Sequence, residues 1–164
     1  MQLHLVSSLM QLHRQGYRWP MAPKPDDSLV AAWVELSRAQ RRASAMVEAR
    51  LKEAGLPPLA WYDALWELDR APESGLRPFE LEQAMLFEQS NLSRLAERLV
   101  KAGLIERRYC AQDRRGFFLA ITPQGRELRK RMWEVYAPAI EEAIGKNLDR
   151  REAEALAGLL SRLG

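Results

Sequence analysis

The sequence is poor in the residues that build disulfide frameworks and metal centres. Its 164 residues include one cysteine and two histidines, His4 and His13. One cysteine cannot form an intramolecular disulfide, which is typical of proteins kept in a reducing cytoplasm. Because no further cysteine or histidine could complete a zinc ligand set, we expect no bound metal.

Long apolar runs are also missing. No stretch approaches the roughly 20 apolar residues that a membrane helix needs. The first thirty residues lack the charged start, apolar core and small-residue cleavage site of a secretory signal. We therefore expect a cytoplasmic protein with no membrane association. A hydrophobic content of 47% beside 29% charged residues is that of a globular chain, and this length suffices for one domain with a real core.

The residue patterns of enzymes are absent as well. The sequence contains no glycine-rich phosphate loop, no metal constellation and no histidine placed to activate a cysteine or serine. Acid pairs such as Glu80 with Glu82 and Glu141 with Glu142 have the spacing of solvated helix faces. We expect that the protein is not an enzyme and uses no cofactor.

Positive charge is present but unevenly distributed. The net charge is only +3. Between residues 90 and 116 there are seven Arg or Lys and three acids, whereas the rest of the chain is slightly negative. Such a local excess favours a polyanionic partner over general solubility. The basic positions are Arg94, Arg98, Lys101, Arg107, Arg108, Arg114 and Arg115.

The chain begins with an arm and a long helix. Residues 1–27 combine weak helical periodicity with the stretch "PMAPKP", and they read as an arm and linker. Both a loosely packed arm and a dimer-clasping helix remain open there. Helix-capping residues at 26–28 predict a helix that runs to Ala54 and stops at Gly55. Its apolar stripe comprises Leu29, Trp33, Leu36, Ala43, Val47, Leu51 and Ala54.

Three shorter helices and a hairpin are predicted next. One helix covers "AWYDALWELDRA", and Pro78 opens another through "FELEQAML". Ser90 caps a third helix over "SNLSRLAERLVKAG", whose stripe of apolar residues faces inward. The β-rich runs "LIERRYC" and "FFLAIT" form an antiparallel hairpin with the charged tip "QDRRG".

Two helices close the predicted order. Thr122 caps and Pro123 starts a long helix, and Asp149 with Glu152 makes a capping box for the last one. The inward positions of the long helix are Leu128, Met132, Val135, Ala139, Ile140 and Ile144. The last helix is striped by Leu156, Leu159, Leu160 and Leu163.

This order predicts a mostly α protein with a small β-hairpin, in which residues 57–122 form a winged helix-turn-helix. The flanking segments, 28–56 and 123–164, carry apolar stripes that so small a domain would not cover, so we expect them to be dimerisation helices of a homodimer. Two-fold symmetry would then place two recognition helices about 34 Å apart on DNA.

The third short helix carries the DNA-binding chemistry. With its stripe in the core, Asn91, Arg94, Arg98 and Lys101 are left on the outer face, and Ser90 and Ser93 lie at its start. Arg can pair with guanine and Asn with adenine in the major groove, whereas serine hydroxyls suit phosphates. We expect Arg98 and Lys101 to contact the DNA backbone. Taken alone, this face could equally be a solvated surface.

The hairpin tip favours the DNA interpretation. Arg114 and Arg115 lie where a winged fold flanks the duplex, and a guanidinium is attracted into a narrow minor groove. A cationic helix and a cationic tip close together in the sequence are hard to explain as coincidence.

Residues from about Leu29 to the end resemble the MarR family of bacterial transcriptional regulators. The motifs that carry the resemblance are "WYDALWEL", "SNLSRLAERLVKAGLIER", "DRRG" and "ITPQGREL". It implies an obligate homodimer, a palindromic DNA site and repression relieved by a small molecule. In the family's Asp-x-Arg wing pattern, matched by Asp113 and Arg115, the Arg enters the minor groove and the Asp braces a nearby basic residue, here Arg94. The family's DNA-contacting helix positions are occupied by Ser90, Asn91, Ser93, Arg94 and Arg98.

The resemblance also implies a cleft for small aromatic carboxylates or phenols between the dimerisation helices and the winged region. Candidates to line it are Trp33, Trp61, Tyr62 and Trp66, with Arg38, Arg41 and Arg42 available for a carboxylate. The competing interpretation is that these tryptophans are core residues and the arginines are merely exposed.

Two alternative functions remain open at this stage. Cys110 lies near Arg107 and Arg108, which lower a thiol pKa, so a redox-responsive regulator is one alternative. The other is a winged-helix protein-interaction module, which need not keep arginines on both helix and tip.

Overall fold

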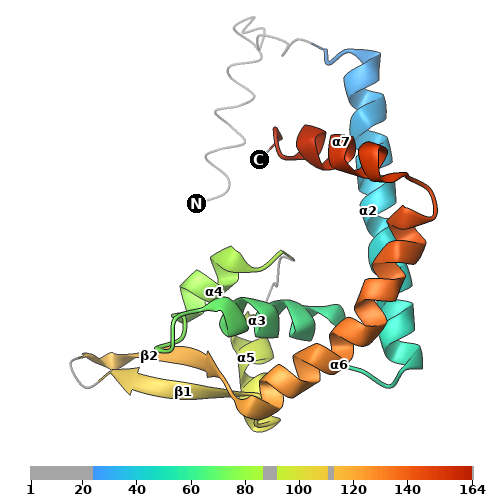
Figure 1. Cartoon of the computed structure of the whole chain (residues 1–164). Coiled ribbons are helices and arrows are strands. Elements are labelled where there is room, and N and C mark those ends of the chain that lie inside the picture. Colours follow the sequence, from blue (N-terminus) through green and yellow to red (C-terminus); the bar gives the residue numbers. More distant parts are fainter. Residues whose placement is uncertain (1–23, 87–91, 111–112, 164) are drawn as a thin grey trace, which may run out of the picture. The chain divides into compact units, whose positions relative to one another are not determined.

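The structure, a computed structural model, describes residues 24–86, 92–110 and 113–163 (Figure 1). The predictions for residues 1–23 lie outside these ranges. The chain divides into two compact units, residues 1–39 and 40–164. The long helix α2 (Asp27–Glu53) has residues in both units, so its two parts are described with their own units.

In the first unit, the start of α2 is a solvated helix. Asp26 Oδ1 accepts a hydrogen bond from Ser28 N at 2.8 Å, which caps the helix as predicted. The apolar residues of its first turns are exposed in the single chain, Trp33 at 70% and Leu29 at 62%. The predicted stripe therefore exists, but its amino-terminal part covers no core in the described chain.

The second unit contains the remaining elements in the predicted order. It holds the carboxyl-terminal part of α2, which ends before Gly55 with φ +66°. Four helices and two strands follow: α3 (Leu59–Arg70), α4 (Pro78–Ala84), α5 (Leu92–Lys101), β1 (Ile105–Cys110), β2 (Asp113–Ile121) and α6 (Pro123–Ile140). A π-helical segment η1 (Glu141–Gly145) and α7 (Arg150–Leu160) complete it. The prediction of a mostly helical winged fold is confirmed.

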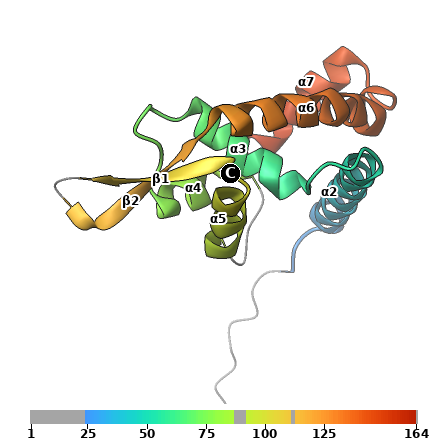
Figure 2. The same cartoon turned by 90° about the horizontal axis from the view of Figure 1, so that it is seen from below.

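The strands form an antiparallel hairpin that projects beside α5 (Figures 1 and 2). The register pairs Ile105 with Ile121 and Tyr109 with Phe117, and it shifts between Tyr109 and Cys110. β2 is longer than predicted, because residues 113–116 extend the strand instead of forming the tip. Only residues 111–112 lie between the strands, so the assignment of "DRRG" to a turn was wrong.

Two clusters of buried side chains make up the core. The first core cluster joins α3, α4, α5 and the hairpin, and its fully buried members include Leu65, Leu81 and Leu99. The second core cluster joins α2, α3 and α6 through Val47, Leu51, Leu59, Tyr62, Met132 and Ala139. The first cluster therefore fixes the winged region, and the second fixes the helices that carry it.

Capping residues predicted from the sequence are confirmed at α6 and α7. Thr122 Oγ1 accepts from Gly125 N at 3.1 Å, while Asp149 and Glu152 exchange bonds at 2.9 Å. The long helix departs from prediction after Ile140, where it becomes π-helical. An extra residue per turn rotates later side chains by about 100°. Ile144 is consequently 39% exposed, and its predicted inward placement was wrong.

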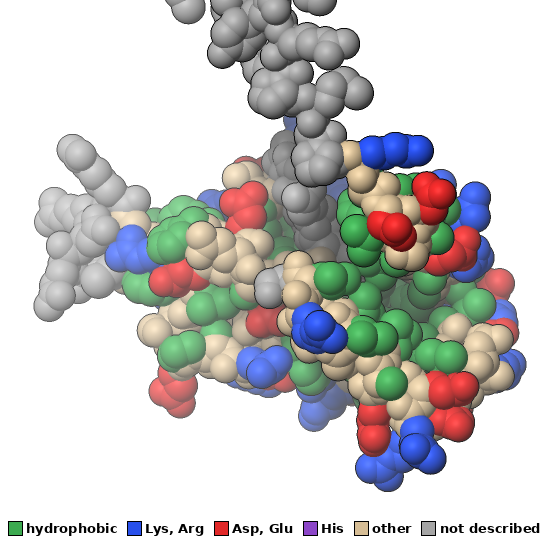
Figure 3. All heavy atoms as spheres, turned by 90° about the horizontal axis from the view of Figure 1, so that it is seen from above, with side chains coloured by type: hydrophobic (Ala, Val, Ile, Leu, Met, Phe, Trp, Pro, Cys, Tyr) green, Lys and Arg blue, Asp and Glu red, His purple; other side chains and the backbone are tan. Residues whose placement is uncertain are grey.

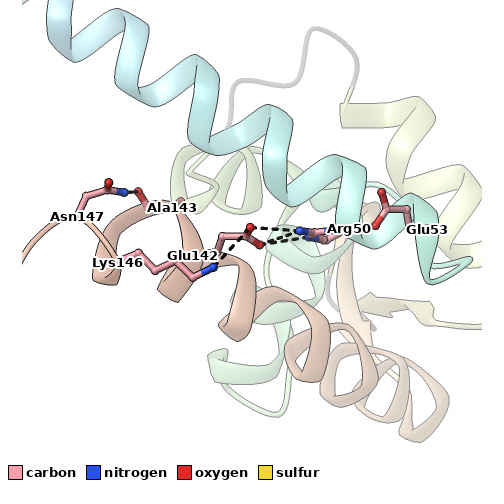
Figure 4. A network of polar contacts seen from close by, with 6 residues as sticks. All are labelled: Arg50, Glu53, Glu142, Ala143, Lys146 and Asn147. Carbon is pink, nitrogen blue, oxygen red and sulfur yellow. Dashed lines mark hydrogen bonds and ion pairs between the residues drawn. The ribbon is translucent and has the colours of Figure 1, made fainter.

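An ion pair ties α2 to η1 in this unit (Figure 4). Arg50 Nη2 lies 2.9 Å from Glu142 Oε2, and a second bond of 3.2 Å makes the contact bidentate. Lys146 Nζ lies 3.8 Å from the other carboxylate oxygen. Arg50 lowers the pKa of Glu142 below its usual value. The pair is solvent-accessible, so it orients the two helices more than it stabilises them.

The turn before α4 depends on a glycine at residue 75. Leu76 pairs with Leu119 across a short bridge, N to O at 3.0 Å and 2.7 Å, which brings the chain against β2. Gly75 has φ +88°, and a Cβ placed on it would lie 2.1 Å from the Leu119 carbonyl oxygen. A side chain is therefore excluded by both conformation and space.

Replacing Gly75 with alanine is expected to reduce the free energy of unfolding by about 1–3 kcal/mol, since strain and backbone displacement add. Gly55→Ala is the matched control, because Gly55 also has a positive φ but its Cβ would meet nothing within 4 Å. Urea unfolding should show a clearly larger loss for Gly75→Ala. Equal losses of unfolding free energy in the two variants would mean that the close contact of residue 75 with Leu119 does not destabilise the alanine variant.

Candidate nucleic-acid interface

The outer face of α5 presents a basic polar surface. Leu92, Leu95, Ala96 and Leu99 are buried in the first core cluster, at most 7% exposed. The opposite face is exposed and carries Ser93, Arg94, Glu97, Arg98 and Lys101. A helix of this kind fits the major groove with its amino-terminal residues toward base edges.

The end of α5 is fixed to the hairpin and to α6. Gly103 follows the helix with φ +72°, and its carbonyl accepts from Thr122 Oγ1 at 2.7 Å. Thr122 N donates to the Leu104 carbonyl at 3.0 Å. The same threonine caps α6, so one side chain positions α5, the hairpin base and α6 together.

The two arginines of β1, Arg107 and Arg108, make different contacts. The Arg107 guanidinium stacks over Phe117 at 5.1 Å. Arg108 instead binds Glu106 Oε1 at 2.7 Å and donates to the Glu73 carbonyl. Arg108 therefore ties the hairpin base to the α3–α4 turn, whereas Arg107 stays on the strand surface.

A further cation lies at the start of α4 and was not predicted. The guanidinium of Arg77 lies 5.0 Å from the centre of the Phe118 ring on β2, and Arg77 N donates to Glu80 Oε2 at 2.7 Å. Arg77 thus adds a positive charge at the junction of α4 and the hairpin. An arginine directly before Pro78, at a helix start, was the available sequence signal.

Several predicted DNA contacts fall outside the described part. Ser90 and Asn91 belong to the undescribed residues 87–91. The backbone of Asp113, Arg114 and Arg115 lies in β2, but their side chains, like that of Cys110, are outside the description. The predicted contact in which Asp113 positions Arg94 therefore also lies outside the described residues. Of the predicted residues, the structure brings Ser93, Arg94, Arg98 and Lys101 together on one exposed face.

A second feature is an aromatic cluster between α3 and α6, composed of Tyr62, Trp66, Trp133 and Tyr136. Tyr62 is its centre, with ring centroids 6.1 Å from Trp66, 6.0 Å from Trp133 and 5.1 Å from Tyr136. Burial raises the pKa of Tyr62 and of Tyr136.

Charged groups surround this aromatic cluster. Arg70 and Arg129 place their guanidinium groups 5.5 Å and 5.3 Å from the centre of the Trp66 ring. Asp69 binds Arg126 at 2.8 Å and Arg129 at 2.9 Å, which joins α3 to α6. Asp63 is 2% exposed and contributes to raising the Tyr136 pKa. The arrangement offers aromatic faces beside cationic groups.

The residues proposed for a ligand cleft lie in several parts of the described structure. Tyr62 and Trp66 meet in the aromatic cluster, but Trp61 packs against the first core cluster. Trp33 and Arg38 belong to the first unit, where Arg38 pairs with Glu35 at 2.9 Å. Arg41 is exposed on α2. Trp133 and Tyr136 were missed, although their spacing on α6 put them beside the predicted inward positions.

The described residues contain no group of three His, Cys, Asp or Glu side chains that could hold a metal ion. Within the same part of the chain, no helix is long and apolar enough to cross a membrane.

Comparison with known proteins gives a consistent result. Residues 54–116 match the model of the MarR family. The fold resembles Sco3205 of Streptomyces coelicolor, a MarR family transcriptional regulator solved with DNA (TM-score 0.76, 24% identity, covering 87% of this chain and 90% of that one). AbsC of the same organism, also a MarR family transcriptional regulator, gives 0.72 at 24% identity, covering 90% and 95%. BpsR of Bordetella bronchiseptica, whose DNA binding is regulated by 6-hydroxynicotinic acid, gives 0.69 at 21%, covering 88% and 97%.

Members of this family are transcription regulators and not enzymes. The matched residues run from the end of α2 to the middle of β2, and so include α5 and most of the hairpin. Residues 54–116 of this chain thus match the MarR family, and its fold is that of MarR family transcriptional regulators.

Proposed function

We propose that the protein is a cytoplasmic, homodimeric repressor that leaves a palindromic operator when a small aromatic acid or phenol binds. The observation that carries the DNA-binding part is α5, whose apolar face is buried while Ser93, Arg94, Arg98 and Lys101 are exposed together. Arg115 of the wing would enter the minor groove. The Sco3205 structure with DNA supports this use of the fold.

Salt dependence tests the DNA-binding part directly. Lysine and arginine contacts to phosphate release counterions, so the logarithm of the duplex affinity should fall linearly with the logarithm of salt concentration. We expect steep salt dependence on operator DNA, identified by selecting bound fragments from genomic DNA. Purified protein that binds no duplex with such a dependence would contradict the proposal.

Exposed leucines on α7 support the homodimer. Leu156, Leu159 and Leu160 of α7 are 37–58% exposed at helical spacing, and Leu163, just after the end of the helix, is 73% exposed. Hydrophobic side chains are also open to the outside in the view of Figure 3. A stripe of this kind is characteristic of an interface, and two-fold pairing would give the symmetry that a palindrome requires.

Replacing Leu159 with aspartate should therefore raise the dimer dissociation constant by about 100-fold, because the loss of leucine burial at the interface costs roughly 3 kcal/mol. Sedimentation equilibrium would measure it. Arg151→Asp is the control, because it places the same side chain on an exposed, polar position of α7 and should leave the dimer intact. A Leu159→Asp protein that dimerises like the wild type would exclude α7 from the interface.

The aromatic cluster supports the ligand part. Trp133 is 44% exposed and stacks near Tyr62, so it is accessible to a planar molecule. Arg70, which is exposed, offers positive charge for a carboxylate. Regulation of BpsR by an aromatic acid is an example on the same fold.

Operator binding measured by fluorescence anisotropy would test this part with 6-hydroxynicotinate, benzoate and a set of phenols. At least one compound should lower the affinity of the wild type and quench tryptophan emission. Trp133→Leu should reduce that response while keeping operator affinity without the compound. If no aromatic acid or phenol changes operator affinity, the ligand-release mechanism is wrong.

A further inference from the structure

Arg77, the residue before α4, contacts the outer part of the hairpin. Leu76 pairs with Leu119 of β2 in an antiparallel bridge, so the next residue, Arg77, stands opposite Phe118. The Arg77 guanidinium carbon lies 5.0 Å from the centre of the Phe118 ring. A guanidinium at this distance is attracted to the face of the ring. The contact therefore joins the start of α4 to β2.

The backbone of Arg77 is fixed by the first turn of α4. Its N–H donates to Glu80 Oε2 at 2.7 Å, and its carbonyl accepts from Leu81 N at 3.0 Å. Leu81 is fully buried in the first core cluster, which also contains Leu99 of α5. Arg77 is therefore attached to the same core that places the exposed face of α5.

The side chains of β2 become less buried at the position that Arg77 contacts. Leu119 is 0% exposed, whereas Phe118 and Phe117, the next residues toward the tip, are half-buried. These two neighbours point to opposite faces of the strand. On one face Phe117 packs against the edge of the first core cluster, and on the other Phe118 is contacted by Arg77. The outer part of β2 is thus held on both faces, and Arg77 supplies a contact on the second.

We propose that Arg77 is a positioning residue for the wing, acting through Phe118. By holding β2 there, it sets where the backbone of Arg114 and Arg115, four and three residues nearer the tip, lies relative to α5. A wing that is already in place loses less conformational freedom when DNA binds, which increases affinity. The inference rests on the proposed DNA binding by the wing, and Arg77 contributes to it without contacting DNA itself.

Hydrogen exchange of the full chain without DNA tests how firmly β2 is held. In Arg77→Leu, the protected amides of residues 113–118 should exchange about three- to tenfold faster, as expected for loss of a partly exposed cation–π contact. The amides of α5 and α6 should be unchanged. Phe118→Leu removes the ring but no charge, and it should have the same effect. Arg131→Leu, at an exposed position of α6, is the control and should exchange like the wild type.

Operator affinity tests the effect on DNA. Arg77→Leu and Phe118→Leu should each weaken operator binding about three- to tenfold. The double variant should bind about as weakly as either single variant, because both changes remove one contact. The slope of log affinity against log salt should be the same in all three variants as in the wild type, since no phosphate contact is lost.

Three outcomes overturn the inference. The first is unchanged exchange of the β2 amides in Arg77→Leu. The second is a salt slope that decreases by about one unit in Arg77→Leu, because Arg77 would then contact a phosphate itself. The third is additive losses of operator affinity, which would mean that Arg77 and Phe118 act separately. A wild type that binds no duplex would instead contradict the proposed function, and the exchange experiment, which contains no DNA, distinguishes the two failures.

Discussion

Replacing Arg94 with alanine is expected to weaken binding to the specific operator by about 1–3 kcal/mol, or roughly 5- to 150-fold. Arg94 lies in the first turn of α5 on its exposed face, where recognition helices reach base edges. A guanidinium that reads a guanine discriminates among bases, so binding to unrelated duplex should change much less. The measurement is anisotropy on operator and on scrambled DNA at one salt concentration.

Arg98→Ala on the same face provides the contrast. Arg98 is one turn further along α5. If it contacts a phosphate, its loss should weaken binding to operator and to scrambled DNA alike. The slope of log affinity against log salt should decrease by about one unit. Arg131→Ala on α6 should change neither quantity. If Arg94→Ala weakens both duplexes equally, Arg94 contacts the backbone and the bases are read elsewhere.

The elements that could be predicted from the sequence are those whose signals are local. Thr122 and Pro123 define the start of α6, and Asp149 with Glu152 defines the start of α7, because a cap depends on residues within one turn. The exposed face of α5 could also be predicted, since Leu92, Leu95 and Leu99 fix which side is buried and leave Arg94 exposed.

What could not be predicted depends on partners distant in the chain. The length of β2 is set by its register with β1 rather than by the charged residues it contains. The π-helical turn after Ile140 has no simple sequence signature, so the rotation of Ile144 was missed. The bridge between Leu76 and Leu119 arises only when the turn before α4 meets the hairpin.

The candidate ligand site shows the same division. The tryptophan-rich sequence of α3 indicated aromatic side chains, but Trp61 and Trp66 face different core clusters although they are only five residues apart. The other half of the aromatic cluster comes from Trp133 and Tyr136, about seventy residues later. Periodicity assigns a residue to a face, whereas its partner on another helix follows only from the packing.

Met132→Ala is expected to lower the free energy of unfolding by about 2–5 kcal/mol, since it removes a fully buried side chain and leaves a cavity. Met132 is 0% exposed and packs in the second core cluster, which joins Val47 and Leu51 of α2 to Leu59 and Tyr62 of α3. Urea unfolding would measure the loss at one fixed protein concentration, because the proposed dimerisation would make stability depend on concentration.

Leu86→Ala is the control for this change, since Leu86 is 76% exposed and its truncation should alter stability by no more than about 0.5 kcal/mol. A Met132→Ala loss below 1 kcal/mol would mean that the helices repack around the cavity. Because Tyr62 belongs both to this core and to the aromatic cluster, the same variant should shift tryptophan emission in the folded protein. The core that joins α2 and α6 to the winged region therefore also sets the geometry of the proposed effector site.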